Sequence, residues 1–169
     1  MQKILVISDT HNNQRLLRKA CENENDASHI FHLGDNYSDL DNNYDLTHSK
    51  TILKVPGIFH PGYRNKSLPY FQIISVNLWN FLLVHDIGDL KNLTKINDID
   101  VLLHGHTHHP EITTHENFTI FNPGHLKRNL DRGEVPTYGI LSFDGEELTL
   151  KIKGLNNQII SSVNLVRDR

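Results

Sequence analysis

The stretch "VLLHGHTHHP" (residues 101–110) decides the predicted fold, because an apolar run of strand length ends there in four closely spaced histidines. Alternate side chains of an extended segment point to the same side, so His106 and His108 can converge on one point while Thr107 faces away. Neutral imidazole is the commonest metal-binding side chain. The stretch therefore predicts a strand with metal ligands at its carboxyl end, and the rest of the chain must supply the other ligands.

The same pattern recurs along the chain, where apolar runs end in groups that contain Asp, His or Asn. Five runs share it: residues 4–8 before Asp9-Thr10-His11, 29–33 before Gly34-Asp35, 81–84 before His85-Asp86, 101–104 before the histidine group, and 118–121 before Asn122-Pro123-Gly124. Continuous apolar runs of this length are typical of strands buried on both faces, in a sheet covered by helices. Ligands of open α/β sheets bind beyond the carboxyl ends of the strands, so the pattern predicts a site at one sheet edge.

Helical periodicity is confined to the first part of the chain and to one later segment. Residues 12–24 place four apolar side chains between Leu16 and Cys21 at helical spacing behind an asparagine cap, which predicts a β-α-β start. A second short helix is predicted over residues 89–96.

The C-terminal part predicts antiparallel strands. Residues 137–143 and 147–153 flank Asp144-Gly145, a hairpin signal, although one further residue leaves the loop length open. Residues 158–166 are predicted as the last strand. Early helices and late hairpin strands together predict a two-sheet sandwich with helices outside.

Length and composition exclude several classes of protein. A chain of 169 residues suits one domain with a real core, so residues 1–169 are predicted to form a single domain. Contents of 37% hydrophobic and 22% charged residues argue against disorder. The formal net charge of −3 gives no electrostatic footprint of a nucleic-acid binder, so nucleic acid is not an expected partner. The single cysteine, Cys21, excludes a disulfide framework and a thiolate metal site.

The apolar runs are also too short for a membrane protein. None approaches the length of a membrane span, and the run that ends at Ser8 is too short for the apolar region of a cleavable signal. We therefore expect a cytoplasmic protein without a membrane partner.

The groups at the strand ends form a nitrogen and oxygen ligand set. Such a set suits divalent Mn, Fe, Co, Ni or Zn, and the absence of thiolates argues against a structural zinc site. Two divalent ions about 3.5–4 Å apart can clamp a displacement at phosphorus and generate a hydroxide nucleophile near neutral pH. The predicted ligands are Asp9, His11 and His108 for a first ion, His85 and His106 for a second, and Asp35 as a bridge between the two.

The set of motifs resembles a known superfamily. The order and spacing of "DTH" (9–11), "GD" (34–35), "VHD" (84–86) and "GHTH" (105–108) resemble those of the calcineurin-like metallophosphoesterases, and within them the small single-domain phosphodiesterases of bacteria and archaea. The resemblance runs from residue 2 to about residue 153. It implies an α/β fold, a four-layer α/β/β/α sandwich of two mixed sheets flanked by helices, with two metals at its top edge. The implied ligands are Asp9, His11, Asp35 and His108 for the first metal, and Asp35, His85 and His106 for the second.

One loop departs from the superfamily pattern. The family has Gly-Asn followed by His or Cys and an acid, where residues 57–60 of this chain read "GIFH". Ile58 replaces the asparagine that binds the second metal in the family, so the second ion is expected to bind weakly unless His60 or Asn65 substitutes. His60 stands at the position of the acid. The expected catalytic residues are Asp35, His60 and His85.

Other polar residues near the motifs have less specific predictions. Asp86 replaces a family glycine, and His125 replaces a serine. His125 is expected to contact the substrate or to support a ligand, and Arg128 to bind phosphate or to be solvated. His32 and His104 alternate with the apolar residues of their strands and are expected to be structural.

The leading functional prediction is a metal-dependent phosphoric ester hydrolase that cleaves small phosphodiesters or phosphomonoesters through a hydroxide activated by two metal ions. Manganese is the expected ion, with nickel, iron, cobalt and zinc as alternatives. The expected partner is a small phosphoester, and a homo-oligomer is left open. The alternative is a catalytically weak scaffold of the same fold that acts through protein contacts, like the small retromer subunit of the superfamily. Loss of the asparagine favours the scaffold, retention of six ligands favours the enzyme, and the charge balance disfavours a nuclease.

Overall fold

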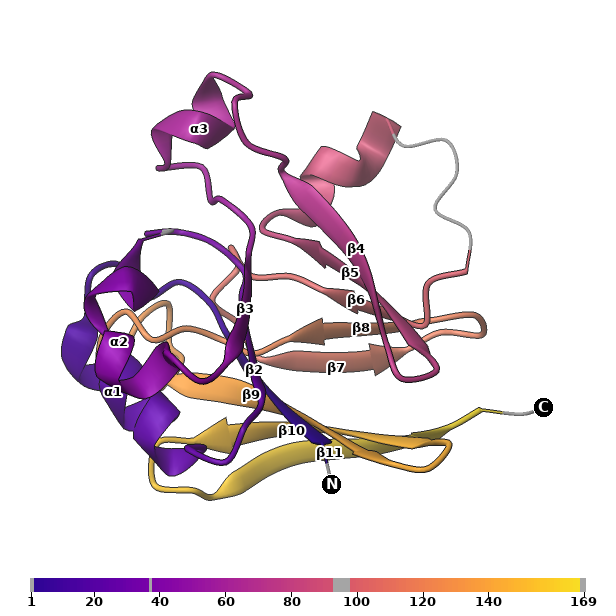
Figure 1. The fold of residues 1–169 in the computed structure, drawn as a ribbon. Helices are drawn as coiled ribbons and strands as arrows, with labels where there is room; N and C mark the ends of the chain where they lie inside the picture. Colours follow the sequence, from indigo (N-terminus) through magenta and orange to yellow (C-terminus); the bar gives the residue numbers. More distant parts are fainter. Residues whose placement is uncertain (1, 37, 93–97, 168–169) are drawn as a thin grey trace.

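The apolar runs of the sequence pair into two sheets that face each other (Figure 1). The computed structural model describes residues 2–36, 38–92 and 98–167. Within these residues, six strands form one sheet: β1 (Gln2–Ile7), β2 (His29–His32), β3 (Thr51–Lys54), β9 (Thr137–Asp144), β10 (Glu147–Gly154) and β11 (Ile159–Val166). Five form the other: β4 (Phe71–Val76), β5 (Trp79–Val84), β6 (Val101–Leu103), β7 (Glu111–Thr114) and β8 (Thr119–Asn122).

Both sheets are mixed. In the first, the order is β11-β10-β9-β1-β2-β3; β1, β2 and β3 run parallel, and the strands from β9 to β11 pair antiparallel. In the second, the order is β4-β5-β6-β8-β7, with β5, β6 and β8 parallel and both edge strands antiparallel. The loops that follow β1, β2, β5 and β6 meet at one edge of the molecule, where the predicted ligands lie.

Alternation along β1 explains why its apolar run is continuous. Ile4 and Val6 point into the core between the sheets, whereas Leu5 and Ile7 point into a second core beneath helix α1 (Gln14–Asn23). All four side chains are fully buried. Burial of one such side chain is worth about 1.5–3 kcal/mol. The prediction of a strand buried on both faces is confirmed for β1.

Helix α1 begins where the sequence predicts, because the Asn13 side chain accepts a hydrogen bond of 3.2 Å from the Leu16 N–H. The remaining helical segments of the described ranges are short: the 3₁₀ helix η1 (Asp39–Asn42), α2 (Tyr44–Thr47), α3 (Pro61–Arg64) and the 3₁₀ helix η2 (Ile87–Asn92). None of the helices formed by the described residues is long and apolar enough to span a lipid bilayer.

The helices lie outside the sheets, as the α/β/β/α prediction requires. Apolar residues of α1 cover the outer face of the first sheet. On the second sheet, Ile87 and Leu90 pack against Leu82, Val84 and Leu102. The helix predicted over residues 89–96 is therefore η2, which is a 3₁₀ helix and starts earlier; residues 93–96 of that prediction lie outside the described residues.

The predicted C-terminal hairpin is confirmed, and its loop has two residues. Asp144 pairs with Glu147, and Gly145 adopts a φ of +61° between them. Strands β3, β4 and β7 were not predicted. All three are edge strands with partly exposed side chains, so their sequences contain no continuous apolar run.

Candidate metal centre

The predicted metal ligands gather at the edge where β1, β2, β5 and β6 end. Two groups, each with ligand atoms within 4.8 Å of one another, are Asp9, His11 and His108, and Asp9, Asp35 and His85. The His106 ring lies beside this pair of groups, with its centroid 5.3 Å from that of His85. The structure thus brings together residues from four separate segments of the chain.

The facing atoms of the first group have separations that suit a shared cation. His108 Nε2 lies 3.2 Å from Asp9 Oδ1, and His11 Nε2 lies 3.9 Å from the same oxygen. Two ligands that each lie about 2.1 Å from one ion are about 3–4.2 Å apart, depending on the angle between them. These pairs therefore have the spacing of atoms that bind a common ion.

The two carboxylate oxygens of Asp35 face different histidines of the centre. Its Oδ2 lies 3.3 Å from His11 Nε2, and its Oδ1 lies 3.4 Å from His85 Nε2. Its two oxygens are therefore directed to histidines of different predicted ions, which is the arrangement that a bridging carboxylate needs.

Several ligand atoms are buried without a hydrogen bond. They are Asp9 Oδ1, His11 Nε2, Asp35 Oδ1 and His85 Nε2. Buried polar groups are nearly always paired, so an orphaned one requires an explanation such as an ion. These oxygen and nitrogen donors match the ligands of divalent transition metals. The residues present therefore fit the predicted metal ions.

Hydrogen bonds on the protein side direct the orphaned atoms inward. Asp9 Oδ2 accepts from the Ser8 hydroxyl at 2.6 Å and from the His106 N–H at 2.9 Å, which leaves Oδ1 for a cation. His85 Nδ1 donates to the Leu33 carbonyl at 2.7 Å, so Nε2 keeps its lone pair. Such outer partners fix the tautomer and the orientation of metal-binding histidines.

His108 is oriented by a carboxylate that no motif in the sequence marks. Its Nδ1 donates to Asp131, which directs Nε2 toward Asp9. Asp131 also accepts from Arg128 Nε at 2.6 Å, and the Arg128 side chain is 63% exposed, so this arginine is ion-paired and solvated. No motif marks Asp131, because it lies 23 residues from its partner, His108.

The ligand loops have unusual backbone conformations. Five ligands have positive φ angles: Asp9 (52°), His11 (45°), Asp35 (38°), His106 (66°) and His108 (65°). Residues other than glycine avoid this region, at a cost of about 1 kcal/mol or more each. Gly105 is required for a different reason, since a Cβ there would lie 1.9 Å from Ser8 Oγ. Strain concentrated on ligands is typical of a functional site.

The protonation states of Asp9 and His11 also suit a cation. Burial alone would raise the pKa of Asp9, but the contact with His108 and the hydrogen bond from the Ser8 hydroxyl lower this pKa to about 2. Burial lowers the pKa of His11 by more than the Asp35 carboxylate raises it. Near neutral pH, Asp9 is therefore ionised and His11 is neutral, which are the forms that bind metal.

The comparison with known families agrees with this centre. Residues 2–146 match the calcineurin-like phosphoesterase superfamily domain. The chain belongs to this superfamily. The resemblance inferred from the four motifs is confirmed, and so is the predicted fold class.

Relatives of the superfamily match along almost the whole chain. A probable metallophosphoesterase of Methanothermobacter thermautotrophicus is 28% identical over 175 residues, which cover 96% of this chain and 98% of the relative. Yfce, a phosphoesterase from E. coli, has a TM-score of 0.71 and 21% identity over 96% of this chain and 98% of its own. Wild-type Vps29 from Entamoeba histolytica, solved in complex with Zn²⁺, has a TM-score of 0.67 and 21% identity over 98% and 99% of the two chains.

The loop that departs from the superfamily pattern lies directly against the centre. A Cβ on Gly57 would lie 2.1 Å from Asp35 Oδ1, so the backbone before Ile58 touches a ligand. Ile58 is partly buried, and the next residue, Phe59, is exposed with its ring centroid 6.0 Å from that of His11. The superfamily asparagine is thus replaced by an apolar residue in a loop that lies against Asp35.

His60 and Asn65, the two possible substitutes for the superfamily asparagine, bind nearby backbone groups. His60 caps α3, and its Nδ1 accepts from the Gly62 N–H at 3.0 Å. Asn65 Oδ1 accepts from the Ser67 N–H at 3.0 Å. The catalytic role of His60 remains a prediction.

His125 has a supporting position. Its Nδ1 accepts from the Lys127 N–H at 3.2 Å and its Nε2 donates to the Glu134 carbonyl at 3.1 Å, in a fully buried ring. The ring centroid lies 5.5 Å from that of His108. Both ring nitrogens of His125 bind the backbone, so the ring has no nitrogen for a substrate. Its packing against His108 agrees with the alternative expectation, that His125 supports a metal ligand.

The expectation that His32 and His104 are structural histidines is confirmed. His32 lies between the Thr10 hydroxyl at 3.4 Å and the Gly34 N–H at 3.2 Å, and burial lowers its pKa to about 4. His104 is buried, and its Nδ1 donates to the Gly105 carbonyl at 3.1 Å.

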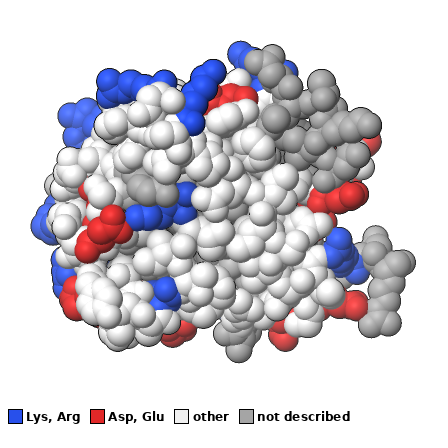
Figure 2. All heavy atoms as spheres, turned by 45° about the horizontal axis from the view of Figure 1, so that its top comes forward, with Lys and Arg blue, Asp and Glu red and all other residues white. Residues whose placement is uncertain are grey.

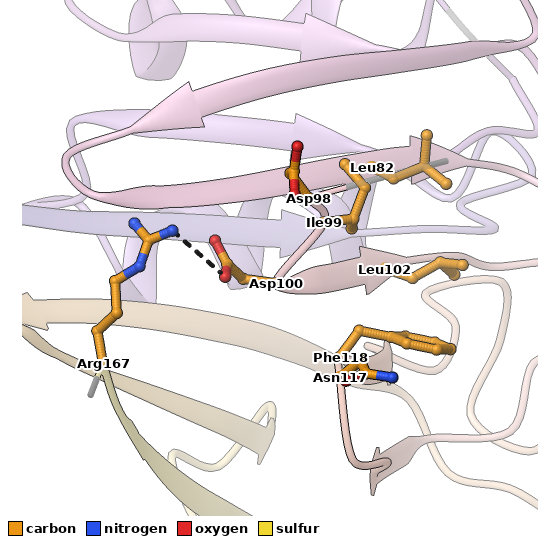
Figure 3. Close-up of a pocket in the computed structure, with 8 residues that line it drawn as sticks. All are labelled: Leu82, Asp98, Ile99, Asp100, Leu102, Asn117, Phe118 and Arg167. Atoms are coloured by element: carbon orange, nitrogen blue, oxygen red, sulfur yellow. Dashed lines mark ion pairs between the residues drawn. The ribbon is translucent and has the colours of Figure 1, made fainter. Parts of the chain in front are cut away.

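A separate cavity lies away from the metal centre (Figure 3). It has a volume of about 710 Å³, and the predicted metal ligands are not among its lining residues. Leu82, Leu102 and Phe118 supply apolar surface, and Arg167 pairs with Asp100 at 3.7 Å across one end. The cavity therefore does not supply the space in which chemistry at the metal centre would occur.

Proposed function

We propose that the chain is a metal-dependent phosphoesterase that hydrolyses small phosphodiesters or phosphomonoesters. The observation that carries this proposal is the set of buried, unpaired ligand atoms on Asp9, His11, Asp35 and His85, which converge at one sheet edge. When bound, two divalent ions about 3.5–4 Å apart supply a nucleophile from water near neutral pH and offset negative charge on a phosphoryl group. Manganese is proposed because the donors are nitrogen and oxygen without thiolate, with nickel, iron, cobalt and zinc as alternatives.

Buried residues of the chain would hold the two ions, and a partly exposed one would border the path of the substrate. Asp35 directs one oxygen to each side and so would hold the two ions at a fixed separation. Asp9, His85 and His108 are buried and would fix the ions, whereas His106 is about one-third exposed and borders solvent. A phosphoester would reach the ions from the His106 side, where the site opens.

Surface charge supports a small substrate over a nucleic acid. On the face in Figure 2, the described Lys and Arg side chains are interspersed with Asp and Glu around a broad uncharged area and do not merge into one basic surface. Binding to a phosphate backbone relies on clustered basic side chains.

We also propose a cytoplasmic location, because the single cysteine is buried and unpaired, as is usual where disulfides do not form.

A catalytically weak scaffold is the second candidate, and two observations favour it. Ile58 removes a family ligand. Vps29 (vacuolar protein sorting 29), whose fold this chain shares, was solved with Zn²⁺, so metal ligands also occur in a protein named for sorting. Retention of all six predicted ligands favours the enzyme.

An activity screen separates the two candidates. Metal-stripped protein would be loaded with Mn²⁺ and assayed with an aryl phosphodiester and an aryl phosphomonoester, with bound metal measured on the same sample. We expect turnover of at least one ester that disappears with a chelator and returns with Mn²⁺. Protein that holds two ions per chain and hydrolyses neither ester would favour the scaffold.

A further inference from the structure

Asp86 lies at the rim of the metal centre, directly after the ligand His85 at the end of β5. Its Oδ1 accepts from the Gly88 N–H at 2.8 Å, which fixes the carboxylate at the start of η2. Its Oδ2 lies 3.7 Å from His106 Nε2. Both side chains are about one-third exposed, so they border solvent at the open side of the site.

The separation of Asp86 from His106 matches the other ligand pairs. At 3.7 Å it exceeds the length of a hydrogen bond, for which N–H···O distances are about 2.7–3.2 Å. It falls within the range of about 3–4.2 Å expected for two ligands of one ion. The neighbouring pairs in the centre span 3.2–3.9 Å. Asp86 and His106 therefore have the spacing of atoms that share a cation.

The second predicted ion needs a further protein ligand. Asp35, His85 and His106 are its predicted ligands, and Ile58 offers no lone pair where the family has an asparagine. The acceptors of His60 and Asn65 that the structure places in this loop bind Gly62 and Ser67. Asp86 Oδ2 is a negatively charged oxygen that already faces one of the three ligands.

We infer that Asp86 is a ligand of the second metal ion and replaces the asparagine that Ile58 has displaced. The inference rests on the metal centre of the proposed function and assigns one more residue to it. A carboxylate carries a full negative charge where a carboxamide carries none, so the second ion binds firmly despite the loss of the asparagine. The weak second site expected from the sequence is thereby replaced by a site that depends on Asp86.

The test is a titration of metal-stripped full-length protein with Mn²⁺, in which the free ion is measured by electron paramagnetic resonance. Wild type is compared with Asp86→Gly, with Asp86→Asn, which keeps an acceptor for the Gly88 N–H, and with Asp89→Asn. Asp89 is a matched control, because it lies three residues away and accepts the Tyr63 hydroxyl at 2.7 Å. Thermal unfolding without metal verifies that each variant folds.

Wild type is expected to bind two ions per chain. Asp86→Gly should raise the Kd of the second ion by about tenfold or more and change that of the first by less than twofold. Asp86→Asn should have a smaller effect in the same direction, and Asp89→Asn should match wild type. Two ions bound by wild type, with a second Kd that neither Asp86 variant changes, would overturn this inference and leave the metal centre standing. Wild type that binds no Mn²⁺ would overturn the centre as well.

Discussion

At the scale of single residues, three ligands of the centre each have one side-chain atom bonded to the protein and another directed at the predicted metal site. Asp9 uses Oδ2 for Ser8 and leaves Oδ1, and His85 uses Nδ1 for the Leu33 carbonyl and leaves Nε2. His108 follows the same rule through Asp131. Asp35 differs, because both of its oxygens face histidines of the centre.

This difference predicts unequal effects of two substitutions. Asp35→Asn removes the charge that both ions share, so kcat with Mn²⁺ should fall by about 100-fold or more. His125→Ala deletes no ligand, and its backbone partners at Lys127 and Glu134 lose hydrogen bonds. It should lower the free energy of unfolding by roughly 1–3 kcal/mol and kcat by less than tenfold. The kcat of each variant is measured at a temperature where that variant is folded. Equal losses of kcat would show that the bridge has been misassigned.

At the scale of elements, the start of α1 connects the ligand-bearing loop after β1 to the loop after β8, which carries Asp131. Asn13 accepts the Leu16 N–H through Oδ1 and donates through Nδ2 to the Lys127 carbonyl at 2.8 Å. The first bond starts the helix, and the second fastens the loop after β1 to the loop after β8. One side chain therefore helps to set the position of the segment from Asp9 to His11.

Asn13→Ala should lower the free energy of unfolding by about 1–2 kcal/mol, because a helix cap and a second hydrogen bond are lost. Urea denaturation of metal-free protein measures this effect. Asn25→Ala, at an exposed position after the same helix, is the matched control and should change stability by less than about 0.5 kcal/mol. An Asn13→Ala variant as stable as the control would mean that the cap is not stabilising.

At the scale of the whole molecule, stability depends on histidines that are buried in the neutral form. His32 is fully buried, and burial lowers its pKa to about 4 from an ordinary value of 6.5. Between these values the unfolded chain takes up a proton at His32 and the folded chain does not. The free energy of unfolding must therefore fall as the pH drops from 6.5 toward 4, and the contribution is complete above pH 6.5.

Without metal, this single group should contribute a loss of up to roughly 3 kcal/mol across that range. The check is urea denaturation of metal-free protein at several pH values, for wild type and for His32→Gln. Other buried histidines titrate in both proteins, so the difference between the two slopes isolates His32. Parallel pH dependences for wild type and His32→Gln would contradict the prediction.

The positions of the ligands at strand ends were determined by the sequence itself. Apolar runs and the residues that end them are adjacent in the chain, so local periodicity predicts β1, β2, β5, β6 and β8 and the polar groups that follow them. The cap of α1 and the hairpin at Gly145 are equally local. The edge strands β3, β4 and β7 were missed because a half-exposed strand lacks that periodicity.

The contacts that orient the ligands were decided only by the tertiary structure. His85 donates to the Leu33 carbonyl, 52 residues away in the sequence, and His108 donates to Asp131, 23 residues away. Asp86 and His106 face each other from the ends of two neighbouring parallel strands. The same packing sets Gly57 against Asp35. Such contacts depend on strand register and on the paths of loops between sheets. These are properties of the packed chain, and no periodicity within a single segment specifies them.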